Sequence, residues 1–285
     1  MKGYPALEST GQIDNGFSHI ASLPDDRIDL ARGALLIAKA AYPDLDESYY
    51  LGRLNRMAAG LTNLITAKMD SVDIITRINH ILFDEEKLHG NRENYYDPDN
   101  SFLNRVLDRR TGIPITLSLI YIEVAGRLGL DVRGIGLPGH FITALYHEAG
   151  KIFIDPFNRG EILTDDDCRA IILNHLGETG ASDPHWLEPI GRKEFLIRML
   201  RNLKLIYAQA DNDVMLFRMV HWILTLQPES PVELRERAMI YEAIGDPARA
   251  IKDWQLYIAN ASGLENEESI RTRIDYLQKQ KSRIH

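Results

Sequence analysis

The chain has 285 residues, of which 33 are Lys or Arg and 41 are Asp or Glu, so its formal net charge is −8 at pH 7. An acidic protein repels phosphate, which argues against nucleic acid as its partner. A hydrophobic fraction of 45% is typical of a globular chain, and no stretch free of charged residues reaches the about 20 residues that a membrane helix needs. With one cysteine, Cys168, and no secretory signal, we expect a cytoplasmic protein without disulfides or membrane contact.

The N-terminal part of the chain is predicted to change from an irregular arm to helices. Residues 1–25 are rich in Gly and Pro and show no period, so they are expected to be a loose arm. Apolar residues then recur every three to four positions in three segments, which predicts three amphipathic helices. The three stripes begin at Ala31, Leu51 and Val72.

A polar loop and a buried helix follow. The segment His89–Asn100 contains two adjacent tyrosines and three asparagines, and long loops of this kind are often functional. Pro114 stands where a helix is expected to begin, because its missing N–H costs nothing at the first helical position. The apolar face from Leu117 to Leu128 predicts a central helix that ends at Gly129.

Three short strand-like runs come next, at 132–137, 140–146 and 151–157, with a hairpin turn between the last two. Helices followed by antiparallel strands indicate an α+β fold that is mainly helical. From residue 191 the chain is again helical in character. Tyr207 and Tyr241 are 34 residues apart, which is the period of tetratricopeptide repeats, so residues 191–285 are predicted to be a repeat region behind a domain at 26–190.

The residues with catalytic potential lie between Asn94 and Asn158. If the hairpin places Asp155 opposite Ile142, then His140 and Asp155 share a face within hydrogen-bond reach. Such a pair is the base and orienting half of a catalytic triad. Thr116, two residues into the central helix, is a candidate hydroxyl nucleophile, whereas Cys168 follows three aspartates that should raise the pKa of its thiol.

These motifs resemble a known superfamily. Gly112-Ile113-Pro114, the helix after it, Gly139-His140-Phe141 and Ile154-Asp155-Pro156 look like the papain-related transglutaminase-like core, and more narrowly like the bacterial SirB group with tetratricopeptide tails. The resemblance implies a helical lobe with a small antiparallel sheet around a central helix, and it assigns His140 and Asp155 to the catalytic His and Asp. The cysteine of catalytic members falls on or beside Pro114, so the resemblance implies that the nucleophile is lost.

Three functions remain open at this point. The first is a non-catalytic regulatory module that binds a protein or peptide through the former active-site cleft of the superfamily and through the repeat tail. The second is a hydrolase or acyl transferase that uses Thr116 or a nearby Ser with the His140–Asp155 pair. The third is a metal site on that pair, but no histidine has ligand spacing, so we predict neither metal nor cofactor. The expected cleft residues are Asn94, Tyr95, Tyr96, Asn100, Arg109, Arg110 and Asn158.

Overall fold

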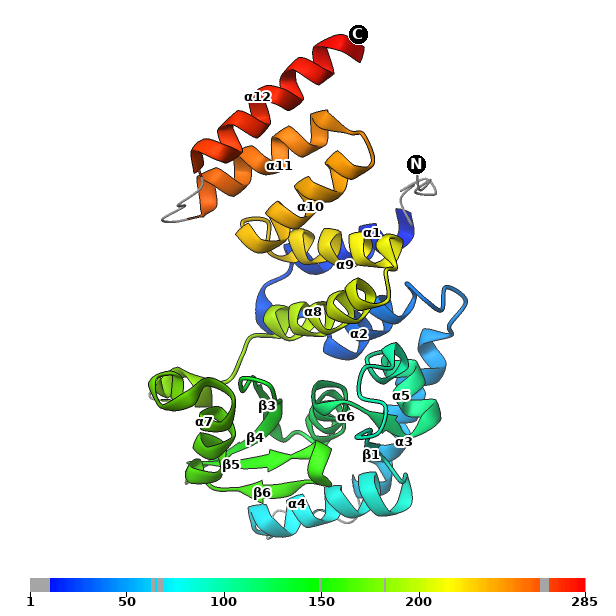
Figure 1. The fold of residues 1–285 in the computed structure, drawn as a ribbon. Helices are drawn as coiled ribbons and strands as arrows, with labels where there is room; N and C mark the ends of the chain where they lie inside the picture. Colours follow the sequence, from blue (N-terminus) through cyan, green and yellow to red (C-terminus); the bar gives the residue numbers. More distant parts are fainter. Residues whose placement is uncertain are drawn as a thin grey trace. The chain divides into compact units, whose positions relative to one another are not determined.

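The computed structural model describes residues 11–62, 65, 69–148, 150–181, 183–261 and 267–284. The chain divides into two compact units, whose elements are labelled in Figure 1. Unit 1 combines Met1–Ser22 with Leu200–His285, and unit 2 is Leu23–Met199. The division falls inside helix α8 (Arg192–Gln209) rather than between residues 190 and 191.

Unit 2 is the α+β part of the chain. Its helices are α2 (Leu30–Ala38), α3 (Glu47–Thr62), α4 (Ser71–Asn79), α5 (Leu103–Arg109), α6 (Pro114–Arg127) and α7 (Asp165–Ala181). Short helical turns are η1 (Asp25–Arg27), η2 (His80–Glu85), η3 (Pro98–Asn100), η4 (Pro156–Asn158) and η5 (Pro184–Leu187). The predicted three opening helices, the central helix and the strands are therefore present, with ends that differ by a few residues.

Helix α6 is the centre of unit 2 and packs against α2, α3, α5 and the sheet. It begins at Pro114, as predicted, because proline needs no hydrogen-bond acceptor in the first turn. Ten of its residues are buried, among them Leu119, Ile120 and Tyr121 with no exposed surface. The chain leaves the helix through Gly129, whose φ of +79° suits glycine and ends the helix.

A four-stranded antiparallel sheet in the order β3-β4-β5-β6 lies beside α6 in unit 2 (Figure 1). Its strands are β3 (Asp131–Ile135), β4 (Ile142–His147), β5 (Gly150–Asp155) and β6 (Glu161–Leu163). Thr143 pairs with Ile154, so the β4–β5 register is the one that sets Asp155 opposite Ile142. The strand β6 and the two-residue parallel pair β1 (His89–Gly90) and β2 (Thr111–Gly112) are too short to give a periodic signal in the sequence.

Unit 1 is all helical. Besides the end of α8 it contains α1 (Gly11–Ser22), α9 (Asp213–Leu226), α10 (Pro231–Ala243), α11 (Pro247–Asn260) and α12 (Glu267–Ile284). The 34-residue offset is visible in its turns. Asn212 and Asp246 both cap the following helix, through the N–H groups of Met215 and Arg249, and the residue before each cap has a positive φ. Helix–turn–helix units with this spacing are the tetratricopeptide pattern.

The expectation of a loose arm over residues 1–25 is wrong for residues 11–22, which form α1; residues 1–10 lie outside the described part. Phe17 of α1 is fully buried and stacks on Trp222 of α9, with 4.5 Å between ring centroids. Asp14 accepts a hydrogen bond of 2.8 Å from the indole N–H of Trp222. Gly11 and Gly16 obscured the helical spacing of Ile13 and Phe17, and these contacts stabilise a helix of poor intrinsic propensity.

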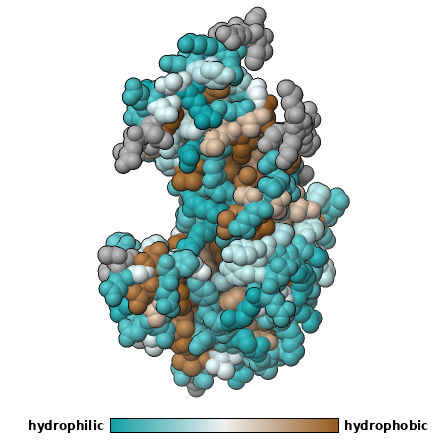
Figure 2. Space-filling model, in the orientation of Figure 1, coloured by the Kyte–Doolittle hydropathy of each residue, from teal (hydrophilic) through white to brown (hydrophobic). Residues whose placement is uncertain are grey.

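Hydrophilic residues cover most of the face that Figure 2 shows, and apolar atoms gather where α7 lies. Leu173 and Leu176, one turn apart on α7, are 44% and 42% exposed. No helix in the described part of the chain has the length and apolar character to span a bilayer.

Candidate functional site

His140 follows a tight turn that joins β3 to β4. The N–H of His140 bonds to the carbonyl of Leu137 at 3.3 Å, with Pro138 and Gly139 in the central positions. Gly139 has a φ of +69°, and a Cβ there would lie 2.3 Å from the ring of His175 on α7. A type II turn prefers this Pro-Gly sequence, so the turn fixes the position of the His140 backbone from which the imidazole extends.

Asp155 is positioned by the turn that it caps. One of its oxygens, Oδ1, accepts the backbone N–H groups of Phe157 and Asn158 at 3.0 and 3.3 Å, with Pro156 in the first position of η4. The other oxygen, Oδ2, is left for side chains and accepts the amide N–H of Asn158 at 2.8 Å. Contacts within residues 155–158 are therefore enough to orient the carboxylate.

The predicted contact between His140 and Asp155 is present. Nε2 of His140 lies 2.7 Å from Oδ2 of Asp155. The Asp155 side chain is 1% exposed and the His140 side chain 15% exposed. Within the described residues Nδ1 of His140 has no hydrogen-bond partner. A carboxylate on Nε2 favours the tautomer with its proton on that nitrogen, which leaves the lone pair of Nδ1 available as an acceptor.

The start of α6 offers no free nucleophile. Pro114 is buried at the first helical position. The Thr116 hydroxyl has no exposed surface; it lies 2.8 Å from the carbonyl of Asn100 and 3.1 Å from that of Ile113, and it accepts the Ile113 N–H at 3.1 Å. These backbone partners use the hydrogen-bonding capacity of the hydroxyl and brace the helix start.

The two other candidate nucleophiles are also buried. Ser118 donates a long bond of 3.4 Å to the carbonyl of Phe141, next to His140. Cys168, in the first turn of α7, has no exposed surface, and its pKa is raised to about 12 by burial first and then by Asp165 and Asp167. A thiol with such a pKa is protonated and unreactive at neutral pH.

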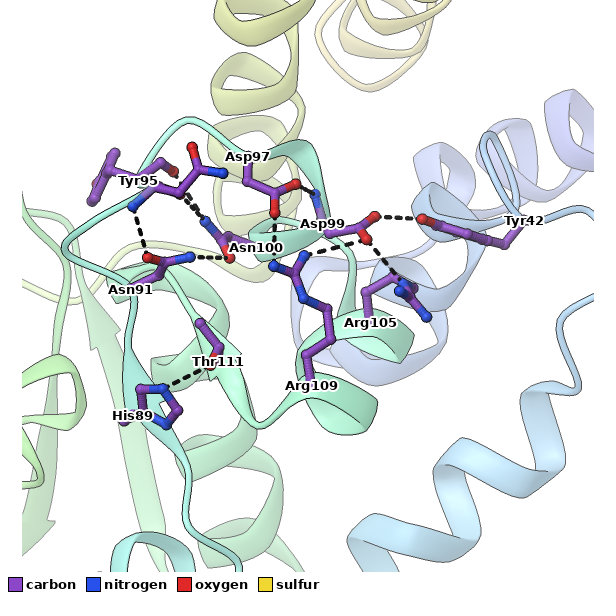
Figure 3. A network of polar contacts seen from close by, with 11 residues as sticks. Tyr42, His89, Asn91, Tyr95, Asp97, Asp99, Asn100, Arg105, Arg109 and Thr111 are labelled. Carbon is purple, nitrogen blue, oxygen red and sulfur yellow. Dashed lines mark hydrogen bonds and ion pairs between the residues drawn. The ribbon is translucent and has the colours of Figure 1, made fainter.

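The loop before α5 is held from inside by asparagines (Figure 3). Asn100 has no exposed surface; its side-chain amide donates to the carbonyls of Asn94 and Tyr95 at 2.7 and 3.2 Å and accepts from the Asn91 amide at 3.1 Å. Oδ1 of Asn91 accepts the N–H of Asn94 at 2.9 Å. Asn100 thus shapes the loop and is not a surface contact, which differs from its expected place in the cleft.

Arg109 is also engaged within the fold (Figure 3). It pairs with Asp97 at 2.7 Å and with Asp99 at 3.2 Å, and the hydrogen bond that it donates to Asp97 raises the pKa of its guanidinium further. Asp99 also accepts from Arg105 at 3.0 Å and from the Tyr42 hydroxyl. This network ties Asp97 and Asp99 of the η3 turn to α5, so Arg109 holds the loop and has little capacity left for a ligand.

The loop presents its two tyrosines outward, Tyr95 at 38% and Tyr96 at 57% exposure, in edge-to-face contact. Tyr95 also lies edge-on to Phe157, with 6.4 Å between centroids, and His140 contacts the same ring at 6.1 Å. The structure therefore brings Tyr95, Phe157, His140 and the neighbouring Asn158 together. Arg110 and Asn94 are exposed. Arg110 adopts the left-handed conformation and ends α5.

The sequence interpretation missed three residues of this site. Arg92 lies over the Phe157 ring, 5.2 Å from its centroid, and donates to Oδ1 of Asn158. Gly90 makes room for Phe157, because a Cβ at Gly90 would lie 2.5 Å from the ring. His175 lies against Gly139 from α7. Gly90 and Arg92 stand in the polar loop already singled out, but the sequence gives no sign of which ring they contact.

No group of three or more His, Cys, Asp and Glu in the described residues is placed to bind a metal ion. Two histidines that precede the site in the sequence have other contacts. His80 pairs with Asp84 at 3.2 Å, and His89 contacts the Thr111 hydroxyl at 2.8 Å (Figure 3).

Comparisons with known proteins agree with this architecture. The transglutaminase-like superfamily matches residues 48–201, and a tetratricopeptide repeat family matches residues 203–275. Tetratricopeptide arrays form extended surfaces for protein interaction, so this part of the chain is a protein-interaction module.

Relatives that match most of this chain occur in bacteria. A UPF0162 protein of Xylella fastidiosa is 32% identical over 276 residues, covering 94% of this chain and 97% of that protein. The protein SirB1 of Salmonella typhimurium is 21% identical over 267 residues, covering 93% and 99%. F-box only protein 21 of Mus musculus is 35% identical over 126 residues, which is 41% of this chain and 20% of that protein. The chain therefore belongs to the transglutaminase-like superfamily, among the UPF0162 and SirB1 proteins that join this core to tetratricopeptide repeats.

Proposed function

We propose that this protein is a non-catalytic, cytoplasmic regulator that binds a protein or peptide through the surface around His140 and through its repeat region. The observation that carries the proposal is Pro114. It occupies the start of α6, and the resemblance places the cysteine of catalytic members at or next to this position; proline has no side-chain nucleophile. The engaged hydroxyl of Thr116 supports the same conclusion.

Exposed residues of the polar loop and of the end of α5 support binding as the role of this part of unit 2. Tyr95 and Tyr96 offer aromatic area at low entropic cost, and Arg110 adds an exposed guanidinium. Each of these side chains can contact a partner without rearrangement of the buried network behind it.

Partner capture tests this proposal. The tagged full-length chain is crosslinked in a lysate of its own organism, and captured proteins are quantified by mass spectrometry. We expect Tyr96→Ala and Arg110→Ala to reduce capture of a specific partner at least fivefold, and His140→Ala to have little effect. Tyr49→Ala, which removes another exposed tyrosine, is the matched control. Full capture by the Tyr96 and Arg110 variants would contradict the proposal.

The alternative is a hydrolase or acyl transferase with a Thr or Ser nucleophile, which is favoured by the 2.7 Å contact between His140 and Asp155. Such an enzyme would form a covalent adduct with a fluorophosphonate, or with a glutamine-type electrophile. Intact mass spectrometry of the wild type, Thr116→Val, Ser118→Ala and His140→Ala would detect the adduct. An adduct that disappears in a hydroxyl variant and in His140→Ala would establish the enzyme and end the non-catalytic proposal.

A further inference from the structure

Arg92 is oriented by an aromatic ring and an amide oxygen, and it forms no ion pair with the described residues. Its guanidinium lies over the Phe157 ring at 5.2 Å from the centroid, and its Nη2 donates to Oδ1 of Asn158. The residue is exposed, and no carboxylate pairs with it among the residues that the structure describes. One aromatic face and one amide oxygen therefore orient the group, while its remaining N–H donors stay available.

Neighbouring arginines differ in this respect. Arg105 and Arg109 pair with Asp99 and Asp97, and Arg159 pairs with Asp84 at 2.5 Å. Each of these guanidinium groups already has an acidic partner within the fold. Arg92 differs from these three because its charge is unmatched in the described structure, although the Phe157 ring and the Asn158 amide oxygen orient its guanidinium.

The contacts behind Arg92 fix the orientation of the Asn158 amide. The Nδ2 group of Asn158 donates to Asp155 Oδ2 at 2.8 Å, so Oδ1 must face outward, where Arg92 donates to it. The same Asp155 oxygen accepts His140. A buried carboxylate thereby sets the positions of the imidazole and of the guanidinium, one directly and one through an amide.

Phe157 brings these groups to one place. Arg92, Tyr95 and His140 all contact its ring, and Gly90 leaves space for it. Arg92, Tyr95 and His140 therefore surround one ring, at 5.2, 6.4 and 6.1 Å from its centroid. The site combines a positive charge with aromatic surface in a chain whose net charge is −8.

We infer that Arg92 is a carboxylate receptor, and that the ligand of this site is a peptide that presents a carboxylate to Arg92 and an aromatic or apolar residue to Tyr95 and Tyr96. This inference rests on the proposed peptide-binding function. A guanidinium forms paired hydrogen bonds with a carboxylate, and one that is already ordered loses little entropy on binding. The carboxylate is either a chain terminus or an acidic side chain, and the two sources are separated by experiment.

Three Ala-rich pentapeptide probes with one central Tyr make the test. The first ends in a free carboxylate, the second in an amide, and the third ends in an amide but carries one Glu. Binding to the full-length ¹⁵N-labelled chain is followed by NMR, including the side-chain signals of Arg92 and Asn158. We expect one or both acidic probes to bind about tenfold more tightly than the neutral probe, since a charge-assisted bond contributes about 1.4 kcal/mol or more. A preference for the first probe identifies a terminal carboxylate, and a preference for the third identifies a side chain.

The variant Arg92→Gln is expected to abolish the preference for the acidic probes while binding of the neutral probe is unchanged. Arg159→Gln, an equal loss of charge next to Asn158, is the control and is expected to keep the preference. Equal binding of all three probes, an unchanged preference in Arg92→Gln, or no binding of any probe would overturn the carboxylate inference. None of these outcomes bears on partner capture through Tyr96 and Arg110, so failure of this inference can be distinguished from failure of the proposed function.

Discussion

Nε2 of His140 and Oδ2 of Asp155 lie 2.7 Å apart, and the carboxylate that makes this contact is almost completely buried. The same carboxylate caps η4 and accepts the Asn158 side chain. Asp155 therefore holds the His140 ring, the Asn158 side chain and the η4 turn in their relative positions.

Replacement of Asp155 by Ala is expected to destabilise unit 2 by about 3 kcal/mol, because several buried donors lose a charged acceptor. Urea unfolding followed by circular dichroism measures the loss. Asp44→Ala, which removes an exposed carboxylate with no described partner, is expected to change stability by less than about 0.5 kcal/mol. A loss below about 1 kcal/mol at Asp155 would mean that the neighbouring donors find water instead.

Substitution by Ala at two glycines of unit 2 is expected to change stability in opposite directions. Gly90→Ala places a Cβ 2.5 Å from the Phe157 ring and should cost about 1–3 kcal/mol while displacing the ring. Gly126→Ala, within α6, meets open space and should stabilise by about 0.5–1 kcal/mol. Thermal unfolding compares the two, and aromatic NMR signals report the position of Phe157. Equal effects of the two variants would show that Phe157 moves aside freely.

Cys168 is expected to be inert in the native protein. Its pKa of about 12 leaves about one molecule in ten thousand as thiolate at pH 8, and the sulfur has no exposed surface. Ellman's reagent should therefore react only after addition of guanidinium chloride, with one equivalent of thiol released. Rapid native reaction, absent in Cys168→Ser, would show that α7 opens readily.

Acid is expected to weaken unit 1 through His221. Burial first, and then Arg237, lowers the pKa of His221, against smaller opposing effects of Asp14 and Asp253. In the unfolded chain this histidine has a pKa near 6.5 and is protonated below that pH, whereas in the folded chain it stays neutral to a lower pH. The free energy of unfolding therefore falls as the pH drops below about 6.5. The difference in urea midpoint between pH 7.5 and 5.5, followed by tryptophan fluorescence, should shrink in His221→Gln. An identical difference in both proteins would refute this assignment.

The two repeat turns differ in the residue that adopts a positive φ. Asp211 has a φ of +51°, whereas its counterpart 34 residues later, Gly245, has a φ of +78°. Because glycine adopts positive φ without strain, Asp211→Gly should stabilise unit 1 by about 0.5 kcal/mol, and Gly245→Ala should destabilise it by about 1 kcal/mol. Melting temperatures measure both changes. Destabilisation by Asp211→Gly would indicate that the aspartate side chain itself supports the turn.

Much of the fold was readable from local patterns. The apolar face after Pro114 gave the central helix, the short alternating runs gave β3, β4 and β5, and the 34-residue offset gave the repeat turns. Helix α1 was missed because its glycines hide two apolar positions that only Trp222 and its neighbours explain. Strand β6 was missed because three residues carry no period.

The candidate site, like the fold, has features that local sequence predicts and features that depend on tertiary contacts. The sequence by itself determined that His140 follows a Pro-Gly turn, that Asp155 precedes a proline, and that a proline opens the central helix, because turn and cap preferences are local properties of the chain. Only the tertiary structure decided that Asn100, Arg109 and Thr116 face inward and that Arg92 meets Asn158 over the Phe157 ring. Those outcomes depend on which segments distant in sequence bury one another's polar groups, and the free energy of each hydrogen bond is set by that burial.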